Sequence, residues 1–390
     1  MGFRAFVCCT AMAIALAAGA SAGVMNPIPG DPVTIDTGKL SGTLLPSGVK
    51  AYLGVPFAAP PVRELRWHAP MPVKPWSGVY NADTKLSHCY IPLRATTLNH
   101  YFGERPSSED CLYLNIWVPK DAKPGAKLPV VVWIPGGGFQ EGSANFDIYG
   151  GEPLAKKGVI YVGIPYRVNV FGNMAHPELT KESGHNASGN WGLMDMIAGL
   201  QWLQRNVAGF GGDPANVTVL GQSAGAMAVD DLSVSPLAKG LYAKIVGLSG
   251  SWHGPAAPAH PVLAATEALG VKMQEAMKAK DIAELRTMPA DKIYNTAITD
   301  KVFFPGPNID GYVLPETPEA GYAARHQTDV PMLLASVGND GNSHNAVTDA
   351  TTLAEYRKAA DGAAIAAAAP IRNWRRLVIR ISGRWACGWK

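Results

Sequence analysis

The sequence predicts an α/β fold with a mostly parallel central sheet, and two observations carry this prediction. Short runs rich in Val, Ile and Leu recur without strict polar alternation, as strands do when both faces of their sheet are covered. Helix-like segments lie between these runs, and strands that alternate with helices build parallel sheets with right-handed crossovers. The strand-like runs are residues 130–134, 159–164, 217–220, 244–248 and 332–335.

The clearest helix is predicted over residues 192–206. Its apolar positions recur at three- and four-residue spacing: Leu193, Met196, Ile197, Leu200 and Leu203. The region before residue 120 is rich in Pro and Gly, which predicts antiparallel strands and loops. With 390 residues, 47% apolar and 17% charged, the chain can bury a sizeable core in one or two domains.

The N-terminus predicts an export signal. Arg4 supplies a positive charge, residues 11–18 form a short apolar stretch, and ASA at residues 20–22 fits a small-x-small cleavage site. The stretch is too short to span a bilayer comfortably, and a buried N-terminal helix is the alternative. We therefore expect residues 1–22 to be a signal peptide, and the mature protein, with no integral membrane segment, to be secreted or periplasmic.

Three cysteines remain once the signal, with Cys8 and Cys9, is removed. Cys89 and Cys111 enclose 21 residues of polar, loop-like sequence, and an oxidising compartment favours their pairing. Closing a loop of that size contributes about 3 kcal/mol. Two unrelated thiols are the alternative, and Cys387 is the unpaired third.

A nucleophile is predicted at Ser223. The sequence GQSAG at residues 221–225 directly follows the strand-like run 217–220 and precedes a helix-compatible segment. A serine on a sharp strand-to-helix turn has strained backbone geometry, so the residues two positions away must be small. The helix that follows supplies N–H groups and the positive end of its dipole. The alternative is a glycine-rich turn without chemistry.

A second glycine motif, GGGF at residues 136–139, follows the strand-like run 130–134. Consecutive glycines let the backbone approach a substrate closely and present its N–H groups. We assign the N–H groups of Gly137, Gly138 and Ala224 as an oxyanion hole, in which one donor lowers an acyl-transfer barrier by about 3 kcal/mol. A hairpin or a phosphate loop is the alternative, but no Lys-Ser/Thr pair follows.

Several ordered motifs together resemble the type-B carboxylesterase family, which includes the cholinesterases. They are EDCLYLN at 109–115, GGGF, GQSAG, GVPFAAPP at 54–61, YR at 166–167, NVAGFGGDPANVTVL at 206–220 and IDG at 309–311. The resemblance covers about residues 32–362. It implies an α/β-hydrolase fold, a Cys89–Cys111 disulfide and cofactor-free hydrolysis of small-molecule carboxylic esters. Gln222 and Pro135 depart from the family pattern without removing a catalytic residue.

The resemblance also locates the acid of the catalytic triad. A serine needs a histidine to take its proton and a carboxylate to orient that histidine, in the chain order Ser, acid, His. The family's acid follows a strand, and here residues 330–335 lead to Asp340, in an Asn-Asp-Gly sequence that also suits a plain turn. The family's histidine comes roughly a hundred residues later, whereas only His344 follows Asp340 here. We therefore expect the catalytic histidine to be missing, with His344 as the alternative base.

The last twenty residues have an unusual composition. They carry six basic side chains, three Trp and no acid, although the whole chain has a net charge of only +3. We interpret residues 370–390 as an anomalous tail, typical of a shifted reading frame or a truncated gene, after a domain that spans 23–369 and lacks its last strand and helix. A tail that binds a membrane surface or nucleic acid is the alternative.

The sequence thus predicts a serine carboxylesterase that acts through an acyl-enzyme, with neither cofactor nor metal. Its activity depends on a histidine that the family pattern does not place in this chain. A non-catalytic binding or adhesion protein on the same fold, or an inactive fragment, is the alternative function. The near-neutral charge gives no argument for a nucleic-acid partner. Neither the acyl and alcohol specificity nor the oligomeric state follows from the sequence.

Overall fold

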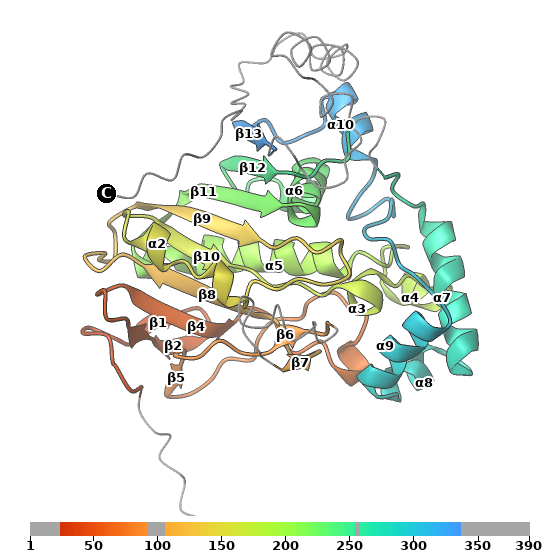
Figure 1. The fold of residues 1–390 in the computed structure, drawn as a ribbon, viewed down its shortest axis with the longest axis horizontal. Coiled ribbons are helices and arrows are strands. Elements are labelled where there is room, and N and C mark those ends of the chain that lie inside the picture. The colour runs from red at the N-terminus through yellow and green to blue at the C-terminus, as the bar shows by residue number, and fades with distance from the viewer. Residues whose placement is uncertain (1–23, 92–105, 254–257, 337–390) are drawn as a thin grey trace, which may run out of the picture.

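An eight-stranded sheet forms the centre of the computed structural model, which describes residues 24–91, 106–253 and 258–336 (Figure 1). The strand order is β13-β12-β11-β9-β10-β8-β4-β3. Strands β10, β9, β11, β12 and β13 run parallel, whereas β8, β4 and β3 pair antiparallel. The bounds are β3 Thr43–Leu44, β4 Lys50–Pro56, β8 Tyr113–Val118, β9 Leu128–Ile134, β10 Ile160–Gly163, β11 Gly212–Gln222, β12 Lys244–Leu248 and β13 Met332–Ala335.

All five strands expected from apolar runs are present, and they are the five parallel ones. β12 and β13 have the predicted bounds. β11 begins five residues earlier than predicted, because Gly212 pairs with Leu128 before a register shift that ends at Val217. The polar stretch between these two pairings carries no period-2 signal, so the sequence did not reveal it.

The N-terminal region is only partly antiparallel, which corrects the expectation for the residues before 120. β1 (Val33–Ile35) pairs antiparallel with β2 (Gly38–Ser41), but β2 pairs parallel with β5 (Val79–Asn81). β6 (His88–Cys89) and β7 (Ser107–Ser108) are also parallel. Pro and Gly content predicts short strands, but strand direction depends on the long connections between them.

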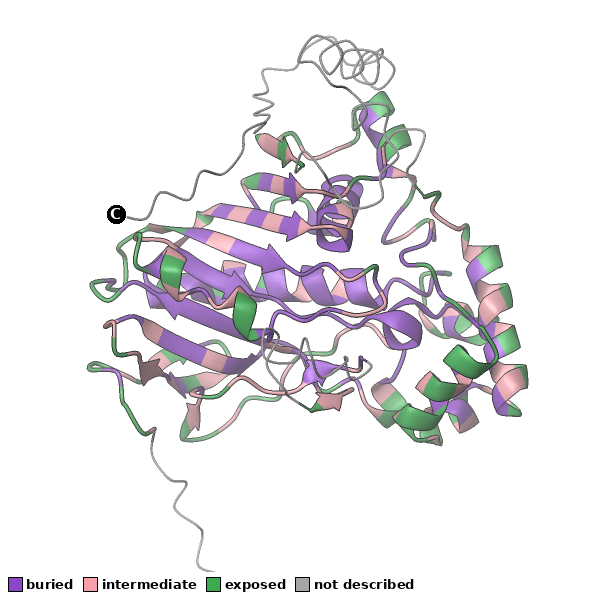
Figure 2. Cartoon of the chain, in the orientation of Figure 1, coloured by how far each residue is buried: buried purple, intermediate pink, exposed green. Residues whose placement is uncertain are grey.

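Helices cover both faces of the sheet, which explains its apolar strands. On β9, Val130, Val132 and Ile134 pack in the same cluster as α5 (Trp191–Asn206) and α6 (Ala224–Val234). The alternate residues Val131 and Trp133 pack with α2 (Glu152–Ala155). Because successive side chains of a strand point to opposite faces, α5 and α2 lie on opposite sides. Figure 2 shows the central strands buried between these layers.

A second apolar cluster lies beside the sheet, where Figure 1 shows α7, α8 and α9 gathered together. It joins these helices to α3 and α4 through fully buried side chains such as Met174, Met273 and Leu285.

No helix in the described part of the chain is long and apolar enough to cross a membrane. The bounds are α3 Asn169–Asn173, α4 Pro177–Glu182, α7 Leu263–Met277, α8 Ile282–Thr287, α9 Ala290–Thr299 and α10 Pro318–Ala324.

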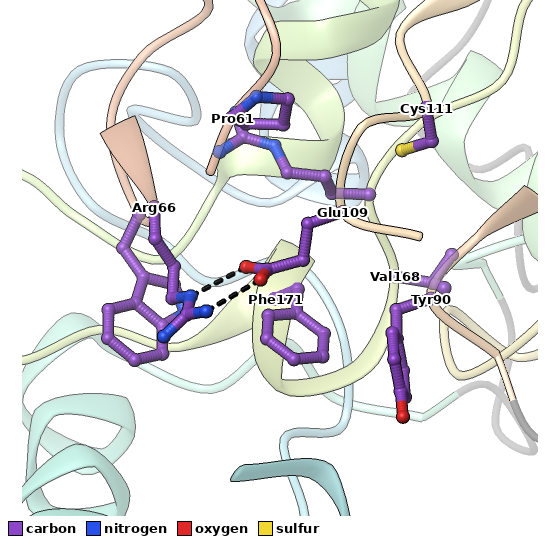
Figure 3. Close-up of a pocket in the computed structure, with 9 residues that line it drawn as sticks. Pro61, Arg66, Tyr90, Glu109, Cys111, Val168 and Phe171 are labelled. Atoms are coloured by element: carbon purple, nitrogen blue, oxygen red, sulfur yellow. Dashed lines mark hydrogen bonds and ion pairs between the residues drawn. The ribbon is translucent and has the colours of Figure 1, made fainter. Parts of the chain in front are cut away.

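A buried ion pair ties these helices to the EDCLYLN segment (Figure 3). Arg66 donates from Nε and Nη2 to both carboxylate oxygens of Glu109, each at 2.6 Å, and from Nη1 to three carbonyls at the end of α8. The pocket around this pair has a volume of about 10 Å³, which is room for one water molecule. The pair is therefore a structural link rather than a ligand site.

The structure joins Cys89 and Cys111 by a disulfide, with their Cα atoms 4.9 Å apart. Both residues are buried, and they connect β6 to the segment that leads into β8. The expected signal peptide, the tail after residue 369 and Cys387 lie outside the described residues, as does any strand or helix that would follow β13.

Candidate active site

Ser223 lies between the end of β11 and the first residue of α6. Its φ of 55° and ψ of −126° are unusual for a residue with a side chain, and Ser223 is only partly buried. Its N–H donates to the Leu248 carbonyl at 2.9 Å, and its own carbonyl accepts the N–H of Met227 at 3.0 Å. The strand–turn–helix predicted around the serine is therefore present, and hydrogen bonds on both sides hold the turn.

The two glycines of GQSAG are required by close backbone contacts. A side chain on Gly221 would overlap the carbonyl of Gly225, and one on Gly225 would overlap the carbonyls of Ile134 and Pro135. Gly225 thus lets α6 pack directly on the end of β9. Small residues are thus required on both sides of Ser223, as the sequence predicts. At Gly225 the neighbouring strand β9 also requires a small residue.

Three parallel strand ends meet at Ser223, because β9, β11 and β12 are neighbours and their carboxyl ends share one edge of the sheet. The glycine loop follows β9: a Cβ on Gly136 would lie 3.0 Å from the Cβ of Ser223. The segment after β12 approaches from the other side, where a side chain on Gly250 would overlap the Ser223 carbonyl. This arrangement leaves no room for larger residues at either position.

The glycine loop adopts a conformation that only glycine takes readily. Gly137 and Gly138 have φ values of 127° and 62°, and the Gly137 carbonyl accepts the N–H groups of Gln140 and Glu141, both at 3.0 Å. Ala224, the third expected donor, opens α6, where N–H groups lack intrahelical partners and the dipole favours negative charge. The structure thus brings the glycine loop, Ser223 and Ala224 together at one site.

The expected acid and base are not among the residues that the structure describes: Asp340, His344 and also His100 lie outside them. β13 ends at Ala335, five residues before Asp340. Within the described ranges, no residue forms a hydrogen bond with the Ser223 hydroxyl. Seven histidines lie in these ranges, and each contacts a group other than Ser223. The pairs are His68 with Glu182, His88 with Phe146, His176 with Gln274, His185 with Tyr312, His253 with Asp230, His260 with Asp231, and His326 with Glu316.

Two Asp–His pairs on α6 were not foreseen from the sequence. Asp230 contacts Nε2 of His253 at 3.0 Å, and Asp231 contacts Nε2 of His260 at 2.8 Å. Both carboxylates lie about two helical turns, roughly 10–12 Å, along α6 from Ser223. The sequence gives one sign of these pairs, which is two adjacent acids in a helix of small apolar residues. It does not identify their histidine partners, because these lie in a loop that is distant in the sequence.

These two pairs differ in their environments. Burial raises the pKa of Asp231 to about 6, although its hydrogen bond to His260 opposes the shift. Burial by itself would lower the pKa of His253, but the hydrogen bond and the charge of Asp230 outweigh it, so the pKa of His253 is raised. The side chain of His253 is 30% exposed, whereas that of His260 is 2% exposed.

Arg167 anchors the segment beside the glycine loop to α5. It donates to Asp195 of α5 from Nε and Nη2, each at 2.8 Å, and from its backbone N–H. Its neighbour Tyr166 donates to the carbonyl of Pro135, at the start of the glycine loop, at 2.8 Å. The described residues contain no group of three His, Cys, Asp or Glu side chains that could hold a metal ion.

Known proteins share this architecture. Residues 30–371 match the Carboxylesterase family. The chain is 38% identical to the fumonisin B1 esterase of Sphingopyxis macrogoltabida over 312 residues, which are 79% of this chain and 56% of that protein. It is 36% identical to the para-nitrobenzyl esterase of Bacillus subtilis, covering 79% of this chain and 63% of the relative, and 36% identical to the acetylcholinesterase of Bungarus fasciatus, covering 80% and 53%.

Solved structures agree with this similarity. A PNB esterase structure superimposes with a TM-score of 0.71 at 32% identity, covering 83% of this chain and 64% of that one. A carboxylesterase of Geobacillus stearothermophilus gives a TM-score of 0.69 at 33% identity, covering 78% and 61%. The chain thus spans between half and two thirds of the length of these relatives. By its sequence and its α/β-hydrolase fold, the chain belongs to the carboxylesterase family.

Proposed function

We propose that this chain is a carboxylic ester hydrolase whose nucleophile is Ser223. The observation that carries the proposal is the strained turn of Ser223 with the glycine loop packed beside it. Ser223 attacks the ester carbonyl, and the N–H groups of Gly137, Gly138 and Ala224 stabilise the negative charge that develops on the carbonyl oxygen. The alcohol leaves, and water then releases the acid from the acyl-enzyme.

The acid–base half of the mechanism is assigned to the segment after β13. In the proposal Asp340 orients the base, and His344 is the only histidine that follows it. A base is required because a serine hydroxyl is a poor nucleophile at neutral pH. The seven described histidines all contact groups other than the Ser223 hydroxyl. We therefore propose that the chain carries the nucleophile and the oxyanion hole, and that none of the seven described histidines is the base.

A non-catalytic binding protein on this fold would not need the strained turn. Holding a serine at φ 55° costs of order 1–3 kcal/mol and persists where the surroundings enforce it. The retained glycines at 137, 138, 221 and 225 therefore favour the hydrolase over the binding protein.

Chemical rescue tests this function. Hydrolysis of p-nitrophenyl butyrate is measured with and without imidazole, for the intact chain and for Ser223→Ala in the same buffer. Because imidazole itself hydrolyses the ester, the Ser223→Ala rate is the background. We expect imidazole to produce a rate that depends on Ser223 and saturates with ester. Identical rates for the two proteins at every imidazole concentration would refute the proposal.

We also propose that the mature protein is secreted or periplasmic. Two observations support this: the signal-like residues 1–22, and the Cys89–Cys111 disulfide, since disulfides persist in oxidising compartments. Mass spectrometry of the protein from its native cells should find an N-terminus at residue 23. A mature protein that retains residues 1–22 would contradict the assignment.

A further inference from the structure

A line of four buried side chains connects the glycine loop to the helix that carries Ser223. The ring of Phe139, the residue after Gly138, stacks on Trp252 with centroids 6.0 Å apart and planes within 12°. Trp252 also contacts the ring of His260, at 3.7 Å between centroids with planes tilted by 38°. His260 in turn meets Asp231 of α6, Nε2 to Oδ1, at 2.8 Å. Phe139, Trp252 and Asp231 are buried, and the side chain of His260 is 2% exposed.

α6 also fixes Trp252 directly. Trp252 Nε1 donates to the Met227 carbonyl at 2.9 Å, and its backbone N–H points to Asp230 Oδ2 at 3.4 Å. The indole is therefore held by the helix that carries Ser223, through two hydrogen bonds, and by its ring contact with His260. These contacts fix the position of the indole relative to α6.

Phe139 is the group that stacks on this indole. Its carbonyl accepts the N–H of Asn169 at 2.7 Å and the side chain of Asn173 at 3.1 Å, so its backbone is anchored on the C-terminal side of the glycine loop. Gly306 packs against its ring, where a Cβ would come within 2.8 Å of Phe139 Cδ2. We expect a change in the position of Trp252 to move the Phe139 ring and, with it, the adjoining Gly137–Gly138 peptides.

A buried carboxylate–imidazole pair is an unusual choice for simple packing. Removing a carboxylate from water costs several kcal/mol, and an apolar pair of the same volume is often as stable. In exchange, the hydrogen bond fixes the plane of the imidazole, which an apolar side chain would not do. Asp231 is fully buried. The Asp231–His260 pair is therefore better explained by its effect on the orientation of the Trp252 indole than by a contribution to the stability of the fold.

We propose that Asp231 and His260 are positioning residues for the oxyanion hole. They hold Trp252 against Phe139 and so set the N–H groups of Gly137 and Gly138 relative to Ser223. This inference rests on the proposed function for its kinetic consequence, but its structural part does not. The neighbouring Asp230–His253 pair, whose imidazole packs on Tyr322, provides a matched control.

The structural part is tested by fluorine NMR of the chain labelled with 4-fluorophenylalanine, the Phe139 signal being assigned with Phe139→Leu. We expect this signal to shift in His260→Gln and Asp231→Leu but to stay in place in Asp231→Asn, which keeps a hydrogen bond to His260, and in His253→Gln. A Phe139 signal unchanged in both His260→Gln and Asp231→Leu would overturn the inference. If Asp231→Leu does not fold, His260→Gln alone decides.

The kinetic part uses the imidazole-supported, Ser223-dependent rate. We expect kcat to fall roughly tenfold or more in His260→Gln with KM within about twofold, because an oxyanion hole acts on the transition state. His253→Gln should match the parent, and Asp231→Asn should retain most of the rate. An unchanged kcat despite a shifted Phe139 signal would overturn the inference. Absence of any Ser223-dependent rate in the parent would instead refute the proposed function, while the fluorine signal still decides whether the stack sets the loop.

Discussion

Ser223 holds a backbone conformation that is unfavourable for a serine, and single glycines around it make that conformation possible. Gly221 and Gly225 leave space for each other and for the end of β9, while Gly250 leaves space for the Ser223 carbonyl. The sequence revealed the first two because each lies two positions from the serine in the chain. It did not reveal Gly250, which meets Ser223 only because β11 and β12 are parallel neighbours.

Gly225→Ala tests this at the residue scale. The new methyl group would overlap the carbonyls of Ile134 and Pro135, so we expect a loss of about 1–3 kcal/mol in the free energy of unfolding. Gly150→Ala is the control, because Gly150 has φ −61° and an added Cβ would come no closer than 3.4 Å to the Asp147 carbonyl. Urea denaturation followed by circular dichroism measures both, and equal stabilities for the two variants would contradict the account.

His253 provides a pH-dependent prediction. Burial lowers its pKa but Asp230 raises it more, so the folded-state pKa lies above the ordinary value of 6.5. The pair therefore stabilises the fold fully below pH 6.5, and this contribution is lost as the pH rises through the folded-state pKa. His253→Gln should destabilise the protein by less than about 1 kcal/mol at pH 5.5 and by less still at pH 8.5. A larger effect at pH 8.5 in urea denaturation would show that the sign is wrong.

Among the helices and strands, the sequence predicts those whose apolar residues follow a regular local spacing. The five parallel strands and α5 appear because their apolar spacing reflects burial on one or both faces. The directions of β5, β6 and β7 could not be predicted from the sequence, because parallel or antiparallel pairing depends on the long connections between strands and not on composition. The Asp–His pairs on α6 did not follow either, because each histidine belongs to a loop that folds back only in the tertiary structure.

The Cys89–Cys111 disulfide gives a prediction for β6 and its surroundings. The bond closes a loop across 22 positions of the chain, and in the chain-entropy model such a constraint contributes about 3 kcal/mol by restricting the unfolded state. We expect the double variant Cys89→Ala, Cys111→Ala to lose about this much stability. Adding a reductant should destabilise the parent to the level of the variant and leave the variant unchanged. A variant as stable as the oxidised parent would contradict the prediction.

At the scale of the whole molecule, the site divides into two parts. Ser223, Ala224 and the glycine loop could be predicted from sequence, because each is a short motif at the end of a strand. The described structure brings these parts to one edge of the sheet. An acid and a base cannot be read from local patterns in the same way, since a lone Asp or His has no spacing that identifies it. The assignment of Asp340 as the acid stays a prediction, and so does the expectation of a missing base, with His344 as the alternative.

Ester hydrolysis by the parent chain without added imidazole tests directly whether Ser223 has an effective catalytic base. p-Nitrophenyl butyrate turnover, including any initial burst, is compared for the parent, Ser223→Ala and His344→Ala, each shown to be folded by circular dichroism. If no histidine takes the proton of Ser223, only the oxyanion hole and binding accelerate the reaction, by roughly 10³–10⁴ over water. We predict that the parent turns over no faster than this residual rate and that neither substitution changes the rate much. Rapid turnover by the parent that is abolished in both variants would contradict the account and identify His344 as the base.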